Sequence, residues 1–304
     1  MALWAVNMLK KLAQFKIMSM ELILNVIKML NPKKTRLYLT LVFLGLLFNS
    51  CEEQKEKQNN TPKKKIDTTS VVKENGPKIL PDSLLKFHLL GKCDFTKDTC
   101  FVLVPRRFCN RPIYLQKEVS ERFIEMHEAA KKDSISLIIN SGARNFYAQK
   151  SIWDRKWRAA KRKVKKDTSG LNIEKNKKIA LQILLYCSMP STSRHHWGTD
   201  IDIHHYNGNS YFSKGKGLKE YQWMKKNAHK FGFHQVYTNK KKTKRSGYEE
   251  EKWHWSYIPI ANKYTKKYAQ LIGYKDITGF KGCDLAKEIK AIENYVFGID
   301  KKYK

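Results

Sequence analysis

The sequence predicts an α+β fold, in which a small, mostly antiparallel sheet carries the functional residues and helices flank it. Two observations support this prediction. Short segments rich in β-branched or alternating residues end at turns, as strands do. Longer segments with helical spacing lie before, between and after these strands, which is the arrangement of an α+β domain.

The helices are expected in the longer segments. Val119, Phe123 and Met126 recur at helical spacing, and Gly232 stands where a helix C-cap is expected. A helical, peripheral tail is expected after Lys263, and a loop at residues 166–170. The predicted helices are residues 116–132, 146–165, 175–186 and 218–231.

The strands are expected in short segments between these helices. Residues 199–204 alternate polar and apolar side chains, which would place Asp200, Asp202 and His204 on one face of a strand. Residues 240–247 are lysine-rich and are expected to form a turn or loop. The predicted strands are residues 134–139, 199–204, 233–237 and 252–258.

The first 51 residues are predicted to be an N-terminal extension and a lipoprotein-type signal peptide. Basic residues precede the apolar residues 37–48, a run shorter than the roughly 20 residues that span a bilayer. Cys51 follows Ser50 and resembles the acylated cysteine of bacterial lipoproteins. We therefore expect a membrane anchor at Cys51 in the bacterial cell envelope, with simple secretion or a retained membrane anchor as alternatives. Translation could start at Met1 or at Met29.

Composition separates a tether from a domain. Residues 52–79 are polar and lysine-rich and predict a disordered tether, and residues 80–304 are expected to form the functional domain. The domain has no Cys-x-x-Cys motif, so its cysteines are expected to be structural or free, although Cys93 and Cys100 could close a small loop. The pairing is left open among Cys93, Cys100, Cys109, Cys187 and Cys283.

The chain is strongly basic, with 60 Lys and Arg against 28 Asp and Glu and a formal net charge of +32. Such a balance can indicate nucleic-acid binding. However, the lysines are spread from end to end, and no zinc-finger, helix-turn-helix or RNA-binding signature accompanies them. We expect no nucleic-acid partner and a monomer, with the charge favouring residence near an anionic polymer or surface.

Two segments together contain the groups of a catalytic metal site. The first reads Ser193-x-His195-x-x-Gly198-x-x-x-Asp202, and the second reads Glu251-x-Trp253-His254. Two histidines and an aspartate can hold one catalytic Zn²⁺, while a carboxylate that is not a ligand activates the water. His195, Asp202 and His254 are therefore candidate ligands, and Glu251 is a candidate general base.

These motifs resemble those of the zinc D-alanyl-D-alanine carboxypeptidases and dipeptidases, which are grouped with lysostaphin-type peptidases and the hedgehog signalling domain. A third segment, Ser141-Gly-Ala143-Arg144 followed by Gln149, resembles the family more loosely, because an aromatic residue is usual at the position of Ala143. The resemblance spans roughly residues 84–260. It implies hydrolysis before a terminal D-alanine in peptidoglycan stem peptides.

The resemblance implies that His195, Asp202 and His254 are the metal ligands, and it selects Glu251 as the base from the adjacent glutamates 249–251. It also implies roles for other side chains around the metal. Arg144 would stabilise the oxyanion or bind a substrate carboxylate, and Gln149 and Ser193 would help to position the substrate. His204 is the best candidate to support a metal ligand. L,D-carboxypeptidase, dipeptidase or endopeptidase activity stays open, as does a non-catalytic, zinc-containing wall-binding module. The presence of Glu251 argues against the last alternative, because binding alone needs no base.

Overall fold

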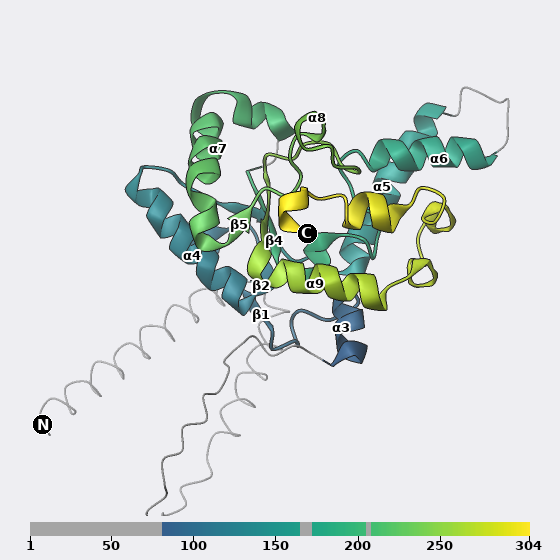
Figure 1. The fold of residues 1–304 in the computed structure, drawn as a ribbon, viewed down its shortest axis with the longest axis horizontal. Helices are drawn as coiled ribbons and strands as arrows, with labels where there is room; N and C mark the ends of the chain where they lie inside the picture. Colours follow the sequence, from purple (N-terminus) through teal and green to yellow (C-terminus); the bar gives the residue numbers. More distant parts are fainter. Residues whose placement is uncertain (1–80, 165–171, 205–207) are drawn as a thin grey trace, which may run out of the picture. The chain divides into compact units, whose positions relative to one another are not determined.

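A four-stranded antiparallel sheet lies at the centre of the computed structural model, which describes residues 81–164, 172–204 and 208–304 (Figure 1). Its strand order is β3 (Ile139–Ser141), β4 (Asp200–Ile203), β6 (His254–Tyr257) and β5 (Phe233–His234). A separate antiparallel pair joins β1 (Phe101–Leu103) to β2 (Tyr114–Gln116). The predicted α+β class is confirmed.

The described residues all belong to one unit, Glu74–Lys304. The predicted extension and signal peptide at residues 1–51, with Cys51, the tether at residues 52–79, and the loop at residues 166–170 lie outside the described residues. Among the residues that are described, no helix is both long enough and apolar enough to cross a membrane.

The four predicted helices are present within a few residues of their expected bounds. The last of them, α7, continues as a 3-10 turn (Ala228–Phe231) that ends at Gly232, whose φ of 81° suits glycine. The helices are α3 (Asp82–Leu89), α4 (Lys117–Lys132), α5 (Phe146–Val164), α6 (Asn172–Ile183), α7 (Gly215–Asn227), α8 (Lys240–Thr243) and α9 (Ile258–Leu271).

The strand predicted at residues 134–139 is wrong, because β3 begins only at Ile139. The Ser134 amide donates to the Lys131 carbonyl and the Ile135 amide to the Ala130 carbonyl. With Ser134 at φ 59°, these bonds complete the C-terminus of α4. Ser134 and Ile135 therefore complete the end of the helix rather than extend the sheet.

The two faces of β4 and β6 have different partners. Ile201 and Ile203 of β4, with Trp255 of β6, pack in a core that also contains residues of α4 and α7. Because neighbouring side chains on a strand point to opposite faces, Asp202 and His254 lie on the other face. The polar face of the sheet is thereby directed at the candidate site.

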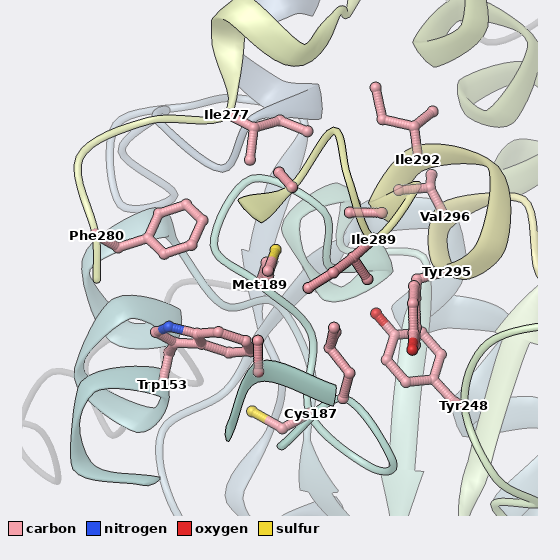
Figure 2. Close-up of a cluster of buried hydrophobic side chains, with 14 of the residues drawn as sticks. Trp153, Cys187, Met189, Tyr248, Ile277, Phe280, Ile289, Ile292, Tyr295 and Val296 are labelled. Carbon is pink, nitrogen blue, oxygen red and sulfur yellow. The ribbon is translucent and has the colours of Figure 1, made fainter. Parts of the chain in front are cut away.

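The second core contains the end of the chain, contrary to the peripheral tail expected from the sequence. Figure 2 shows Ile289, Ile292 and Val296 in one cluster of buried side chains with Trp153 of α5 and Tyr248. The Trp153 indole also donates to the Lys281 carbonyl over 2.8 Å. The tail is thus an integral part of the domain that surrounds the site.

Truncation of a tail side chain is expected to destabilise the whole domain. Leu285 is 4% exposed within this core, so Leu285→Ala should lower the free energy of unfolding by about 2–5 kcal/mol. The matched control is Leu84→Ala, because Leu84 is 53% exposed. Denaturant unfolding of both variants measures the difference, and equal midpoints would show that the tail packs only loosely.

Candidate metal centre

Three predicted ligands converge in the structure. The donor atoms of His195, Asp202 and His254 all lie within 4.8 Å of one another, and all three side chains are buried. The Asp202 Oδ1 atom is 3.3 Å from His195 Nε2 and 3.1 Å from His254 Nδ1. Three donors from separate segments therefore surround one point.

The sheet and one tight turn produce this convergence. Asp202 on β4 pairs directly with His254 on β6, so their side chains adjoin on one face. His195 lies in a 3-10 turn (Arg194–Trp197) that ends at Gly198, where φ is 66°. A Cβ atom at Gly198 would lie 2.4 Å from the Phe101 ring, so this approach of the turn to β1 requires glycine.

The donor chemistry of the cluster fits a divalent cation. His195 Nδ1 donates to the Gly142 carbonyl over 2.8 Å, and burial, followed by the charge of Arg144, lowers the pKa of His195. The neutral ring therefore directs the Nε2 lone pair at a carboxylate oxygen, an arrangement that is repulsive unless a cation lies between them. Two imidazole nitrogens and one carboxylate oxygen are a normal donor set for zinc.

His254 is oriented by a carboxylate that the sequence analysis did not assign. Its Nε2 atom donates to Asp200 Oδ1 over 3.0 Å, leaving Nδ1 directed at Asp202. Burial would lower the pKa of His254, but its hydrogen bonds to Asp200 and Asp202 raise it to about 9. A carboxylate behind a metal-binding imidazole fixes its ring orientation and raises its basicity.

Asp200 is held in turn by a buried arginine. Arg194, which is 1% exposed, donates from Nε to Asp200 Oδ1 over 3.1 Å. Its other nitrogens donate to Ser256 Oγ and Thr265 Oγ1. The alternation of residues 200–203 places Asp200 on the face of Asp202, which was the available sequence signal for this role.

Glu251 lies beside the cluster without being one of its three members. Its Oε2 atom is 3.8 Å from His254 Nδ1, and the side chain is buried. The His254 amide donates to the Glu251 carbonyl over 3.4 Å, so the chain turns between these two residues. Burial raises the pKa of Glu251 to about 8, a value suited to accepting and returning a proton near neutral pH.

Arg144 and Gln149 act as a pair. Arg144 donates from one terminal nitrogen to Gln149 Oε1 over 3.0 Å, and its other terminal nitrogen is 3.7 Å from Asp202 Oδ2. Gln149 is fully buried, and its amide nitrogen donates to the Ser188 carbonyl over 2.7 Å. Gln149 therefore joins Arg144 to the Ser188 carbonyl, and the substrate-positioning role expected for it stays a prediction.

The structure places Ser193 at the site and His204 away from the role predicted for it. Ser193 lines the cavity, and its buried Oγ has no hydrogen-bond partner among the described residues. The supporting role expected for His204 is wrong: this residue has φ 42° and leaves the strand, and its Nε2 atom contacts the amide of Ile138. Asp200 occupies the supporting role instead.

The cluster opens into a cavity of about 620 Å³. The lining combines the metal-binding side chains and Glu251 with aromatic residues and an excess of cations. Its aromatic residues are Tyr186, Tyr237, Tyr248 and Trp253, and its basic residues other than histidine are Arg111, Arg144, Arg155, Lys156 and Arg194.

Comparison with known proteins identifies a matching family. Residues 112–260 match the family model of VanY, D-alanyl-D-alanine carboxypeptidase. The D-alanyl-D-alanine carboxypeptidase of Enterococcus faecalis is 30% identical over 152 residues, which are 50% of this chain and 51% of that protein. The D-alanyl-D-alanine carboxypeptidase of Enterococcus faecium is 27% identical over 156 residues, 51% of this chain and 41% of that protein.

A solved structure is also similar, that of a vancomycin-resistance D,D-pentapeptidase VanY mutant in complex with Zn(II). It is 26% identical, covers 55% of this chain and 89% of its own, and has a TM-score of 0.39. The chain spans about half the length of the curated Enterococcus faecalis relative that it matches. The matched residues 112–260 include all three clustered ligands and Glu251. Residues 112–260, which hold the candidate metal centre, are therefore similar to the VanY family of D-alanyl-D-alanine carboxypeptidases.

Proposed function

We propose that this protein is a zinc-dependent D-alanyl-D-alanine carboxypeptidase that trims the peptide stems of peptidoglycan. The observation that carries the proposal is the convergence of His195, Asp202 and His254 beside Glu251, in one cavity. The family match and the names of the Enterococcus relatives support the choice of substrate.

The side chains of this site divide the work of peptide hydrolysis. When bound by His195, Asp202 and His254, zinc would supply a Lewis acid that polarises a carbonyl and makes water more acidic. Glu251 takes the proton of the attacking water and returns it to the departing amine. Arg144 supplies positive charge next to the reacting carbonyl, where negative charge develops.

The basic lining suits a substrate that ends in a carboxylate. Arg111 donates twice to the Asn140 carbonyl, over 3.0 and 2.8 Å, so its guanidinium is fixed at the cavity wall. Two buried atoms, Arg144 Nε and Ser193 Oγ, have no hydrogen-bond partner among the described residues. Such unsatisfied buried donors favour a ligand with oxygen acceptors, such as the terminal carboxylate of a peptide.

The test compares substrates on the full-length protein. A pentapeptide ending in D-Ala-D-Ala should release D-alanine with zinc, lose the activity after chelation and regain it when zinc is added back. Cleavage of a tetrapeptide with an L,D bond, of free D-Ala-D-Ala, or of an internal bond instead would favour the corresponding peptidase. Absence of cleavage of every substrate would favour a non-catalytic binding module.

Removal of the Gln149 side chain should reduce activity without loss of metal. Gln149→Ala frees Arg144 from its 3.0 Å hydrogen bond, and kcat/KM should fall about 10²-fold because misplacement near 1 Å has such an effect. The control is Gln182→Ala, since Gln182 is exposed on α6. Zinc content, measured by atomic emission, should be unchanged in both. A loss of zinc in Gln149→Ala would contradict a role limited to Arg144.

We also propose that the protein is exported and anchored to the cell envelope through an acylated Cys51. The support is the basic residues before the apolar residues 37–48 and the position of Cys51 after Ser50. Cys51→Ser should move the protein from the membrane fraction to the soluble fraction of the envelope. An unchanged distribution after fractionation would contradict lipid anchoring.

A further inference from the structure

A second cluster of metal-ligating side chains lies between α3 and β1, outside the lining of the cavity. His88, Cys93 and Asp98 each offer one donor atom, and these atoms all lie within 4.8 Å of one another. Within the described part of the chain, it is the one such group besides the candidate catalytic centre. Cys93 and Asp98 are partly exposed, so an ion can reach the cluster from solvent.

The donor atoms are held in place before any ion binds. His88 is 4% exposed at the end of α3, and its Nε2 donates to Asp98 Oδ2 over 2.5 Å, a hydrogen bond that a bound ion would replace. Asp98 Oδ1 accepts the amide of Cys100 over 2.9 Å, which fixes the carboxylate with Oδ2 towards the histidine. The His88 Nδ1 atom is buried without a hydrogen-bond partner among the described residues.

The loop that carries Cys93 is also fixed by backbone hydrogen bonds. The Gly91 amide donates to the His88 carbonyl over 2.9 Å, and the Lys92 amide to the Phe87 carbonyl over 2.8 Å. Gly91 has φ 71°, so the chain reverses there and returns Cys93 to the end of α3. An ion would therefore have to separate His88 from Asp98, but the loop backbone that presents Cys93 is already ordered, which favours binding.

The kinds of donor select the ion. A thiolate together with an imidazole and a carboxylate suits zinc, whereas magnesium and calcium prefer oxygen ligands alone. The catalytic centre has no sulfur among its three donors. The two clusters therefore differ in a property that spectroscopy can separate.

We propose that His88, Cys93 and Asp98 bind a second divalent cation of the zinc class, which joins the end of α3 to the segment before β1. The loop that this ion would hold lies next to residues of the catalytic centre. A Cβ atom on Gly91 would lie 2.2 Å from His196 Nδ1, so the loop is in close contact with this histidine. His196 Nδ1 donates to the Arg144 carbonyl over 2.6 Å, and its neighbour in the chain is His195.

The test is a Co²⁺ titration of the full-length, metal-free protein, kept reduced. A thiolate ligand gives a near-ultraviolet charge-transfer band, whereas nitrogen and oxygen ligands do not. We expect this band in the wild-type protein and its loss in Cys93→Ser. Cys187→Ser and Cys283→Ser are matched controls that should keep it, since Cys187 lines the catalytic cavity and Cys283 lies in the tail. Circular dichroism checks the fold of each variant.

A second variant keeps the test decisive if Cys93→Ser does not fold. Asp98→Asn preserves size but removes the charge, and it should weaken Co²⁺ binding at least tenfold while leaving the thiol in place. The proposal is overturned by the absence of the band in the reduced wild type, or by a band that survives in folded Cys93→Ser. It is also overturned by a Cys93–Cys100 disulfide, seen by mass spectrometry, in protein isolated from its native envelope without reductant.

Discussion

Glu251→Gln is expected to lower kcat about 10³-fold, with a parallel fall in kcat/KM. The amide has nearly the shape of the carboxylate but cannot accept the proton of the attacking water, and general acid–base catalysis contributes about 10²–10⁴-fold. Because Glu251 is not among the three clustered donors, the variant should bind zinc as the wild type does. D-alanine release and zinc content measure the two effects separately.

The neighbouring glutamate provides the control for this prediction. Glu250 directly precedes Glu251 in a run of three glutamates, residues 249–251, but it does not line the cavity. Glu250→Gln should therefore retain wild-type activity. If Glu251→Gln also retained activity, the base would be another group and the proposed division of work would be wrong. If it lost zinc as well as activity, Glu251 would instead have to be a ligand.

Asp200→Asn is expected to damage both stability and metal affinity. Arg194 would keep a buried positive charge without the carboxylate that is now 3.1 Å away, and breaking such a buried pair costs about 3–5 kcal/mol. His254 would lose the carboxylate that orients its Nε2, which should weaken zinc binding about 10–100-fold. Thermal unfolding of the metal-free protein and competition with a chelating dye measure these two effects.

An exposed aspartate separates this effect from a general effect of charge removal. Asp284 is exposed in the 3-10 turn Cys283–Leu285 and belongs to neither metal-binding cluster, so Asp284→Asn should leave both the unfolding temperature and zinc affinity unchanged. Equal behaviour of Asp284→Asn and Asp200→Asn would mean that the buried network does not support His254. A loss of stability without any loss of zinc affinity would limit Asp200 to a role in folding.

The sequence motifs identified the residues of the candidate site, but they did not show which residues from distant segments are in contact. His195, Asp202, His254 and Glu251 were all selected from two motifs, and the structure brings them together. The direct pairing of Asp202 with His254 depends on strand register between residues far apart in the chain. Sequence spacing does not give that register, so Asp200 was not recognised as the partner of His254.

Local patterns also failed where tertiary contacts decide the outcome. The alternation of residues 199–204 predicted His204 on the polar face, but a left-handed backbone conformation at this residue ends the pattern. Lysines are frequent in the tail, so its sequence does not indicate that apolar residues such as Ile289 and Val296 are buried. These residues lie in one core with Trp153 of α5, which comes much earlier in the chain. Gln149 was recognised, but its role depends on two partners that only the folded structure supplies.

The most direct test of the central claim is identification of the bond that the zinc-loaded, full-length protein cleaves. The products of a synthetic stem pentapeptide ending in D-Ala-D-Ala would be followed by mass spectrometry, with the same peptide ending in D-Ala-L-Ala as control. We expect loss of one alanine from the first peptide only, and no loss after chelation. Cleavage at any other bond, or D-alanine release that persists without metal, would contradict it.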